Sequence, residues 1–270
     1  MNERAGGPAS SEPRLTLRGL TIAFDSRRVV DLSELDLGAG EIVGLAGESG
    51  SGKSMTAMAI LGLATHLGAR VGGSIHLEGE ELVGAPERRL REIRGRRIAA
   101  IFQSPVSAFN PVYHVGEGFI GALRLHGADA DEARQRAEGA MREVLLSPDL
   151  LRRYPHQLSG GQAQRVAIAQ ALALRAEVLL ADEPTSALDV TVQAEILDSL
   201  RRVRDEVGMS ILFISHDLAV LAELSDRLAV MQHGVVVESG STAQVLVDPR
   251  DNYTRELVAA VPKIGERLVG

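Results

Sequence analysis

Hydrophobic and polar residues alternate near the start of the chain. Residues 15–22 alternate in the manner of a half-buried strand, and residues 29–37 form a second candidate strand. Short apolar runs, each long enough for one strand, follow at 41–46, 73–77, 98–102, 177–181 and 210–214. Two more runs, 228–231 and 235–238, flank His233 and Gly234 and predict a hairpin.

Helical periodicity separates these strands. Residues 53–63 predict one helix, and residues 192–207 predict another, because Val192, Ile196, Leu200 and Val203 fall on one stripe. The stretch 115–172 is mostly helical in pattern, with interruptions at Pro148 and Pro155. Strands that alternate with helices favour a parallel α/β core. A helical block at about 104–171 then divides this core into an early and a late half.

A glycine-rich stretch lies between the apolar run at 41–46 and the helix predicted at 53–63. It reads Gly47-Glu48-Ser49-Gly50-Ser51-Gly52-Lys53-Ser54 and fits the pattern G-x-x-x-x-G-K-S between a strand and a helix. Its glycines let the backbone curl around phosphate oxygens, and the helix adds the positive end of its dipole. We expect Lys53 to reach the β- and γ-phosphates of a nucleotide and Ser54 to bind Mg²⁺. The alternative is a glycine-rich turn that merely precedes a helix.

Two carboxylates, Asp182 and Glu183, follow the apolar run at 177–181. The carboxyl end of a strand in an open α/β sheet faces the crevice where ligands bind. We expect Asp182 to hold Mg²⁺ and Glu183 to polarise the water that attacks the γ-phosphate. Adjacent acids that only begin a solvated loop are the alternative, and the phosphate-binding pattern favours the catalytic interpretation.

Composition excludes several classes of function. The chain has no Cys, which removes thiolate metal sites, iron–sulfur clusters and Cys nucleophiles. The net charge of -7 argues against a nucleic-acid partner. No run reaches the roughly 18 uncharged apolar residues of a membrane span, so a soluble, cytoplasmic chain is expected. Residues 1–14 are polar and predict a disordered tail, without the apolar segment of a signal peptide.

Further motifs resemble those of ATP-binding-cassette (ABC) ATPases, in family order across about residues 15–240. Residues 158–162 (LSGGQ) match the family's signature motif, residues 182–189 (DEPTSALD) its second acidic motif and D-loop, and residues 214–217 (ISHD) its switch-histidine segment. Gln103 lies where the family has its Q-loop, and Phe24 where an aromatic stacks on adenine, with plain core packing of Phe24 as the alternative.

The resemblance implies an α/β P-loop NTPase with a small antiparallel β subdomain and an inserted helical subdomain. The ATPase domain then spans 15–262, with a RecA-like core at about 15–103 and 172–240, the helical signature subdomain at 104–171 and a C-terminal segment at 241–270. It implies ATP and Mg²⁺ as ligands and catalytic roles for Glu183, His216 and Gln103, with Gln103 also sensing Mg²⁺. The expected nucleotide contacts are Phe24, the residues Gly47 to Ser54, Met55, Ser159, Gly160, Gly161, Gln162 and Asp189.

Several stretches of the sequence are similar to segments of the ATPase subunits of importers for oligopeptides, dipeptides and nickel. These are residues 154–157 (YPHQ), 187–193 (ALDVTVQ), 252–257 (NYTREL), and 103–105 with 108–111 (QSP and AFNP). Phe109 is more like the nickel members. The branch implies a head-to-tail dimer with a second, different ATPase subunit, two membrane permease subunits and, indirectly, an extracytoplasmic solute-binding protein. The chain would then lie on the cytoplasmic face of the inner or plasma membrane.

Two other functions stay open at this point: the ATPase subunit of an exporter, and a soluble ABC ATPase without a transport role. A separate hypothesis concerns residues 104–118. We expect this segment to dock a short cytoplasmic helix of a permease, because Phe109, Val112, Tyr113 and Phe119 lie in or beside it and Gln103 precedes it. The alternative is that these side chains fill the core of the helical insert.

Overall fold

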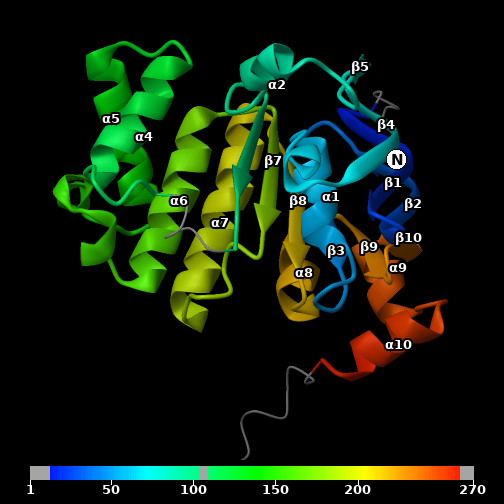
Figure 1. Ribbon diagram of the computed structural model, residues 1–270. Coiled ribbons are helices and arrows are strands. Elements are labelled where there is room, and N and C mark those ends of the chain that lie inside the picture. The colour runs from blue at the N-terminus through cyan, green and yellow to red at the C-terminus, as the bar shows by residue number, and fades with distance from the viewer. Residues whose placement is uncertain (1–12, 104–108, 262–270) are drawn as a thin grey trace, which may run out of the picture.

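A four-stranded antiparallel sheet forms the small β subdomain of the computed structural model, which describes residues 13–103 and 109–261 (Figure 1). Its strand order is β2-β1-β4-β5, with β1 at Leu15–Phe24, β2 at Arg27–Leu37, β4 at Arg70–Leu77 and β5 at Glu80–Glu81. Leu15, Leu17 and Leu20 of β1 are buried on one face. The alternation in the sequence therefore corresponds to one covered and one solvated face, as an antiparallel sheet allows.

A second sheet carries the order β10-β9-β3-β8-β7-β6. All residues of β3, β7 and β8 are buried, because these parallel strands are covered on both faces. β10 pairs with β9 in the antiparallel direction and closes one edge. The bounds are β3 Ile42–Ala46, β6 Ile98–Ile101, β7 Val178–Asp182, β8 Ser210–Ser215, β9 Arg227–Gln232 and β10 Val235–Ser241.

The two faces of this sheet contribute to different hydrophobic clusters. Along β7, Leu180 packs with helix α1 (Lys53–Ile60) and the antiparallel sheet. Leu179 instead packs with α6 (Gly160–Leu174), α7 (Val190–Val207) and α8 (Leu218–Leu224). The predicted parallel α/β core is confirmed, and its strands end on the side that carries the predicted site residues.

Three helices, α4 (Val115–Leu125), α5 (Ala130–Glu143) and α6, form the helical insert beside the sheet (Figure 1). Small side chains let α5 pack closely, since Ala133, Ala137 and Ala140 are buried at helical spacing. A short 3₁₀ turn at Pro148–Arg152 and another at Pro155–Gln157 connect α5 to α6. The two prolines thus mark these turns, as the sequence pattern indicated.

Some short elements had no signal in the hydrophobic pattern. These are α2 (Glu87–Ile93), α8, α9 (Thr242–Val247) and α10 (Asn252–Ala259). Each has eight residues or fewer, so the helical periodicity repeats too few times to be recognised. Arg14, assigned to the N-terminal tail, is anchored: its guanidinium donates to the carbonyl oxygens of Gly208 at 2.7 Å and Glu177 at 3.1 Å. No helix within 13–103 and 109–261 is long and apolar enough to cross a membrane.

Candidate active site

The phosphate-binding pattern forms the loop between β3 and α1. Gly47 has φ 147°, and a Cβ there would lie 2.2 Å from the Met231 carbonyl oxygen, so only glycine fits. Gly50 and Gly52 also have positive φ, 83° and 109°. The loop therefore takes the curled shape that the glycines predicted, and α1 begins at Lys53 directly after it.

Lys53 lies inside this loop. Its Nζ donates to the carbonyl oxygens of Gly47 at 2.7 Å and Glu48 at 2.8 Å. The residue is only 5% exposed, and burial lowers the pKa of its ammonium group although Glu183 and Asp182 attract the positive charge. A buried cation held by neutral carbonyl groups is a suitable partner for an anionic ligand.

Asp182, the last residue of β7, is 5% exposed. Burial raises the pKa of its carboxyl group, while the Ser54 hydroxyl and Lys53 favour the charged form. Its Oδ1 atom is buried and has no hydrogen-bond partner within the described residues. An orphaned carboxylate oxygen beside a hydroxyl is a donor set that fits Mg²⁺, which takes few protein ligands and completes its shell with phosphate oxygens and water.

Glu183 stands at the centre of the candidate catalytic group. Its Oε2 accepts a hydrogen bond from Gln103 Nε2 at 2.8 Å, and its Oε1 lies 2.8 Å from His216 Nδ1. The backbone of Glu183 has φ 48°, which is rare outside glycine, and its N–H donates to the Ile214 carbonyl at 2.9 Å. The three residues predicted to be catalytic thus meet at one point.

The signature residues begin α6. Ser159 caps the helix: its Oγ accepts from the Gln162 N–H at 3.2 Å, and Gln162 Oε1 accepts from the Ser159 N–H at 3.1 Å. A Cβ at Gly161 would lie 3.6 Å from the Ala187 carbonyl oxygen. Gly161 therefore lies near the D-loop, and within the described chain no hydrogen bond joins Ser159 or Gln162 to the phosphate loop.

The other residues predicted to contact the nucleotide lie in different environments, from a helix cap to a partly buried cluster and an exposed loop. Asp189 caps α7, since its Oδ1 accepts from the Val192 N–H at 3.0 Å. Phe24 and Met55 are partly buried against the cluster that contains α1. Ser49 is exposed on the phosphate loop. Nucleotide binding by these residues stays a prediction.

Two contacts to the phosphate loop were not found by sequence reasoning. The Gly234 N–H donates to the Ser51 carbonyl at 2.9 Å, and the Glu48 N–H donates to the Tyr253 hydroxyl at 3.0 Å. Tyr253 belongs to residues 252–257, which we interpreted only as a mark of the importer branch. The sequence around Tyr253 gives no sign of this contact, because the contact joins residues 205 positions apart.

A family model described as ABC transporter matches residues 30–186. The chain belongs to the ABC transporter family. It is therefore an ATPase that converts ATP and water to ADP and phosphate. The fold prediction, including the β subdomain and the helical insert, is confirmed by solved structures. One is the dimeric structure of the bacterial ABC transporter cassette MJ0796, with TM-score 0.75 and 28% identity, covering 84% of this chain and 98% of that one.

Curated relatives are more similar in sequence. The peptidoglycan transport ATP-binding protein YejF of Agrobacterium fabrum is 46% identical over 94% of this chain and 48% of its own length. A putative peptide import ATP-binding protein of Brucella abortus is 44% identical over 95% of this chain and 79% of its own. The glutathione import ATP-binding protein GsiA of Salmonella typhimurium is 44% identical over 93% of this chain and 42% of its own length. The chain thus spans about half the length of YejF and GsiA.

Proposed function

We propose that this ABC ATPase energises the import of peptides, or of peptide-like solutes such as glutathione, through a membrane transporter. The observation that carries the proposal is the 44% identity to a peptide import ATP-binding protein over 95% of this chain and 79% of that relative. GsiA and YejF, which carry glutathione and peptidoglycan in their names, support the same branch. These relatives give no support to nickel as the transported solute, which the sequence left as an alternative.

The geometry supports a division of labour among the site residues. The phosphate loop and Lys53 bind the triphosphate, and Ser54 and Asp182 are the residues that would hold Mg²⁺, which neutralises charge on the β- and γ-phosphates. Glu183 accepts a proton from the attacking water as a general base. Gln103 and His216, each 2.8 Å from a carboxylate oxygen of Glu183, orient this base.

A second ATPase subunit completes the site in this proposal. The N-terminus of α6 carries backbone N–H groups and the positive end of the helix dipole, which attract anions, and it lies beside the D-loop instead of the phosphate loop of its own chain. In a head-to-tail dimer it would contact the γ-phosphate held by the partner. The dimeric structure of MJ0796 supports such an assembly. That the partner is a different chain remains part of the proposal.

Permease binding would use the helical insert. Residues 104–108 of the predicted docking segment lie outside the described residues. Phe119 is 1% exposed and belongs to the insert core, so its assignment to the docking surface was wrong. Phe109 also packs partly against that core. Val112 and Tyr113, in contrast, are 70% and 54% exposed and remain available to a partner.

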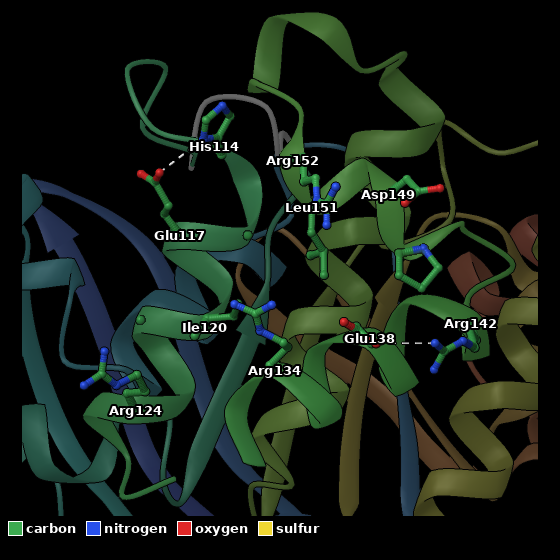
Figure 2. A pocket seen from close by; sticks show the side chains of 13 residues that line it. His114, Glu117, Ile120, Arg124, Arg134, Glu138, Arg142, Asp149, Leu151 and Arg152 are labelled. Carbon is green, nitrogen blue, oxygen red and sulfur yellow. Dashed lines mark hydrogen bonds and ion pairs between the residues drawn. The ribbon is translucent and has the colours of Figure 1, made fainter. Parts of the chain in front are cut away.

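A groove of about 740 Å³ opens next to these residues, between α4, α5 and the turn at Pro148–Arg152 (Figure 2). Glu117 and Glu138 on its wall are paired with His114 and Arg142, as the dashed lines show. Arg124, Arg134 and Arg152 form no ion pair within the described ranges. We infer that the groove and Tyr113 receive a cytoplasmic permease segment with acidic residues, which would hold the chain at the cytoplasmic face of the membrane.

Reconstitution tests the transport proposal. The chain would be purified together with its paired ATPase and with the permeases encoded by neighbouring genes. The complex would then be placed in proteoliposomes and supplied with labelled dipeptide, glutathione or nickel. ATP-dependent uptake of a peptide-like solute is the expected result. ATP-dependent efflux would instead support the exporter, and failure to associate with any permease would support a soluble ABC ATPase.

A further inference from the structure

The C-terminal segment touches the phosphate loop through one side chain. Tyr253, the second residue of α10, is 8% exposed, and its ring packs in the hydrophobic core. Its hydroxyl oxygen accepts a hydrogen bond from the Glu48 N–H at 3.0 Å, which brings α10 to the loop that follows β3 (Figure 1). No role in the activity described above explains this contact.

The same peptide unit is held from both sides. The Gly47 carbonyl and the Glu48 N–H belong to one peptide bond, and in a trans peptide these groups point in opposite directions. Lys53 Nζ donates to the carbonyl at 2.7 Å, while the Tyr253 hydroxyl accepts from the N–H at 3.0 Å. The two side chains therefore fix how this peptide is rotated.

Tyr253 is itself held independently of the loop. Asp251 caps α10, with Oδ1 accepting from the Tyr253 N–H at 2.8 Å. The turn before it is held by Glu238 of β10, whose carboxylate accepts from the N–H groups of Arg250 at 2.9 Å and Asp251 at 3.0 Å. Core packing and this cap place the hydroxyl, so its position does not depend on the glycine-rich loop that it contacts.

We propose that Tyr253 is a positioning residue for nucleotide binding. Its hydroxyl keeps the Gly47–Glu48 peptide rotated so that the carbonyl stays on Lys53 Nζ and holds this ammonium group inside the loop. Gly47 has no side chain to restrict this rotation, and a rotated peptide would withdraw the carbonyl oxygen that holds the Lys53 ammonium group in place for the phosphates. The C-terminal segment thus contributes to ATP affinity without touching ATP.

The test compares Tyr253→Phe, which keeps the buried ring and removes only the hydroxyl, with Tyr154→Phe as a matched control. The expected result for Y253F is a Kd for a fluorescent ATP analogue, and a KM for ATP, that are higher by about 2- to 10-fold, the scale of one lost hydrogen bond. The kcat should stay within about 2-fold, because the residue acts on ground-state binding. Y154F should change neither constant.

Amide exchange distinguishes positioning from a purely structural role. In nucleotide-free Y253F, the Glu48 amide should exchange faster than in the wild type while the amides of α10 keep their protection. An unchanged KM would overturn the proposal. So would a raised KM accompanied by faster exchange along α10, because the hydroxyl would then act only by docking the helix. Neither outcome depends on which solute is transported.

Discussion

His216 Nδ1 lies 2.8 Å from Glu183 Oε1, although the two residues are 33 positions apart. The contact follows from topology: β7 and β8 are parallel neighbours, and each residue follows directly after the carboxyl end of its strand. Gln103, which follows β6 on the other side of β7, reaches the second oxygen of the same carboxylate. The candidate catalytic group is thus assembled by strand order.

Glu183→Gln should separate binding from chemistry. The amide keeps an oxygen that can accept from Gln103 but cannot take a proton from water, so hydrolysis should slow by about 10²-fold or more. ATP binding should persist, and loss of the negative charge near the γ-phosphate should favour an ATP-stabilised dimer, alone or with the paired subunit. Phosphate release and size-exclusion chromatography measure the two effects. Near-normal turnover would move the general base to another residue.

Lys53→Ala should abolish nucleotide binding. The loop would lose its buried ammonium group and leave the Gly47 and Glu48 carbonyl oxygens facing the phosphates. Titration with a fluorescent ATP analogue in the presence of Mg²⁺ measures the loss. Lys263→Ala changes the other lysine of the sequence and serves as the control, with unchanged affinity expected. Equal affinities for wild type and K53A would contradict the assignment of the loop.

Asp182→Asn should stabilise the nucleotide-free protein at neutral pH. Burial raises the pKa of Asp182, so the folded state binds this proton more tightly than the unfolded state does. Stability from that source is present at low pH and is lost as pH rises through the raised pKa. The variant keeps a neutral side chain at every pH and avoids this loss of stability, so its melting temperature at pH 7 should exceed that of the wild type.

The advantage of D182N should shrink as the pH falls towards the ordinary pKa of a carboxyl group, because the wild-type residue is then protonated too. The same variant should hydrolyse ATP poorly if Asp182 holds Mg²⁺. A melting temperature below that of the wild type at pH 7 would show that attraction to Lys53 outweighs the cost of burial.

Charge reversal in the groove should weaken permease binding. Arg134→Glu places a carboxylate opposite an acidic permease segment, so co-purification with the permease and transport should fall. The side chain is exposed, so the melting temperature and ATP binding of the isolated subunit should not change. Arg88→Glu, at an exposed position on α2, is the matched control. Equal permease binding by both variants would exclude an acidic partner in this groove.

Tyr113 and Phe109 provide a second comparison on the same surface. Tyr113→Ser removes a ring that is 54% exposed, and it should reduce permease co-purification without a change in melting temperature. Phe109→Ser should lower the melting temperature by several degrees, because this ring packs against the insert core. If Tyr113→Ser instead lowered the melting temperature and Phe109→Ser instead reduced permease co-purification, Tyr113 would belong to the insert core and Phe109 to the docking surface.

Local patterns in the sequence were sufficient for much of the core. The predictions of the phosphate loop, the buried strands and the three candidate catalytic residues depend on contiguous motifs, and the position of a motif at the carboxyl end of a parallel strand already implies a shared crevice. Local patterns gave less information about which side chains contact one another in the folded chain. Phe119 carries the same aromatic signal as Tyr113, and only packing of α4 against the insert core places one inside and the other outside.

The sequence by itself determined the family and the reaction, and it was enough to predict the phosphate-binding and catalytic residues, because these functions need particular residue types at fixed local spacing. The tertiary structure alone decided that Glu183 is shared by Gln103 and His216, that Asp182 Oδ1 has no partner within the described chain, and that Tyr253 reaches the Glu48 amide. Each of these relationships joins segments distant in the chain. Their geometry depends on strand order, burial and helix docking, which no local pattern records.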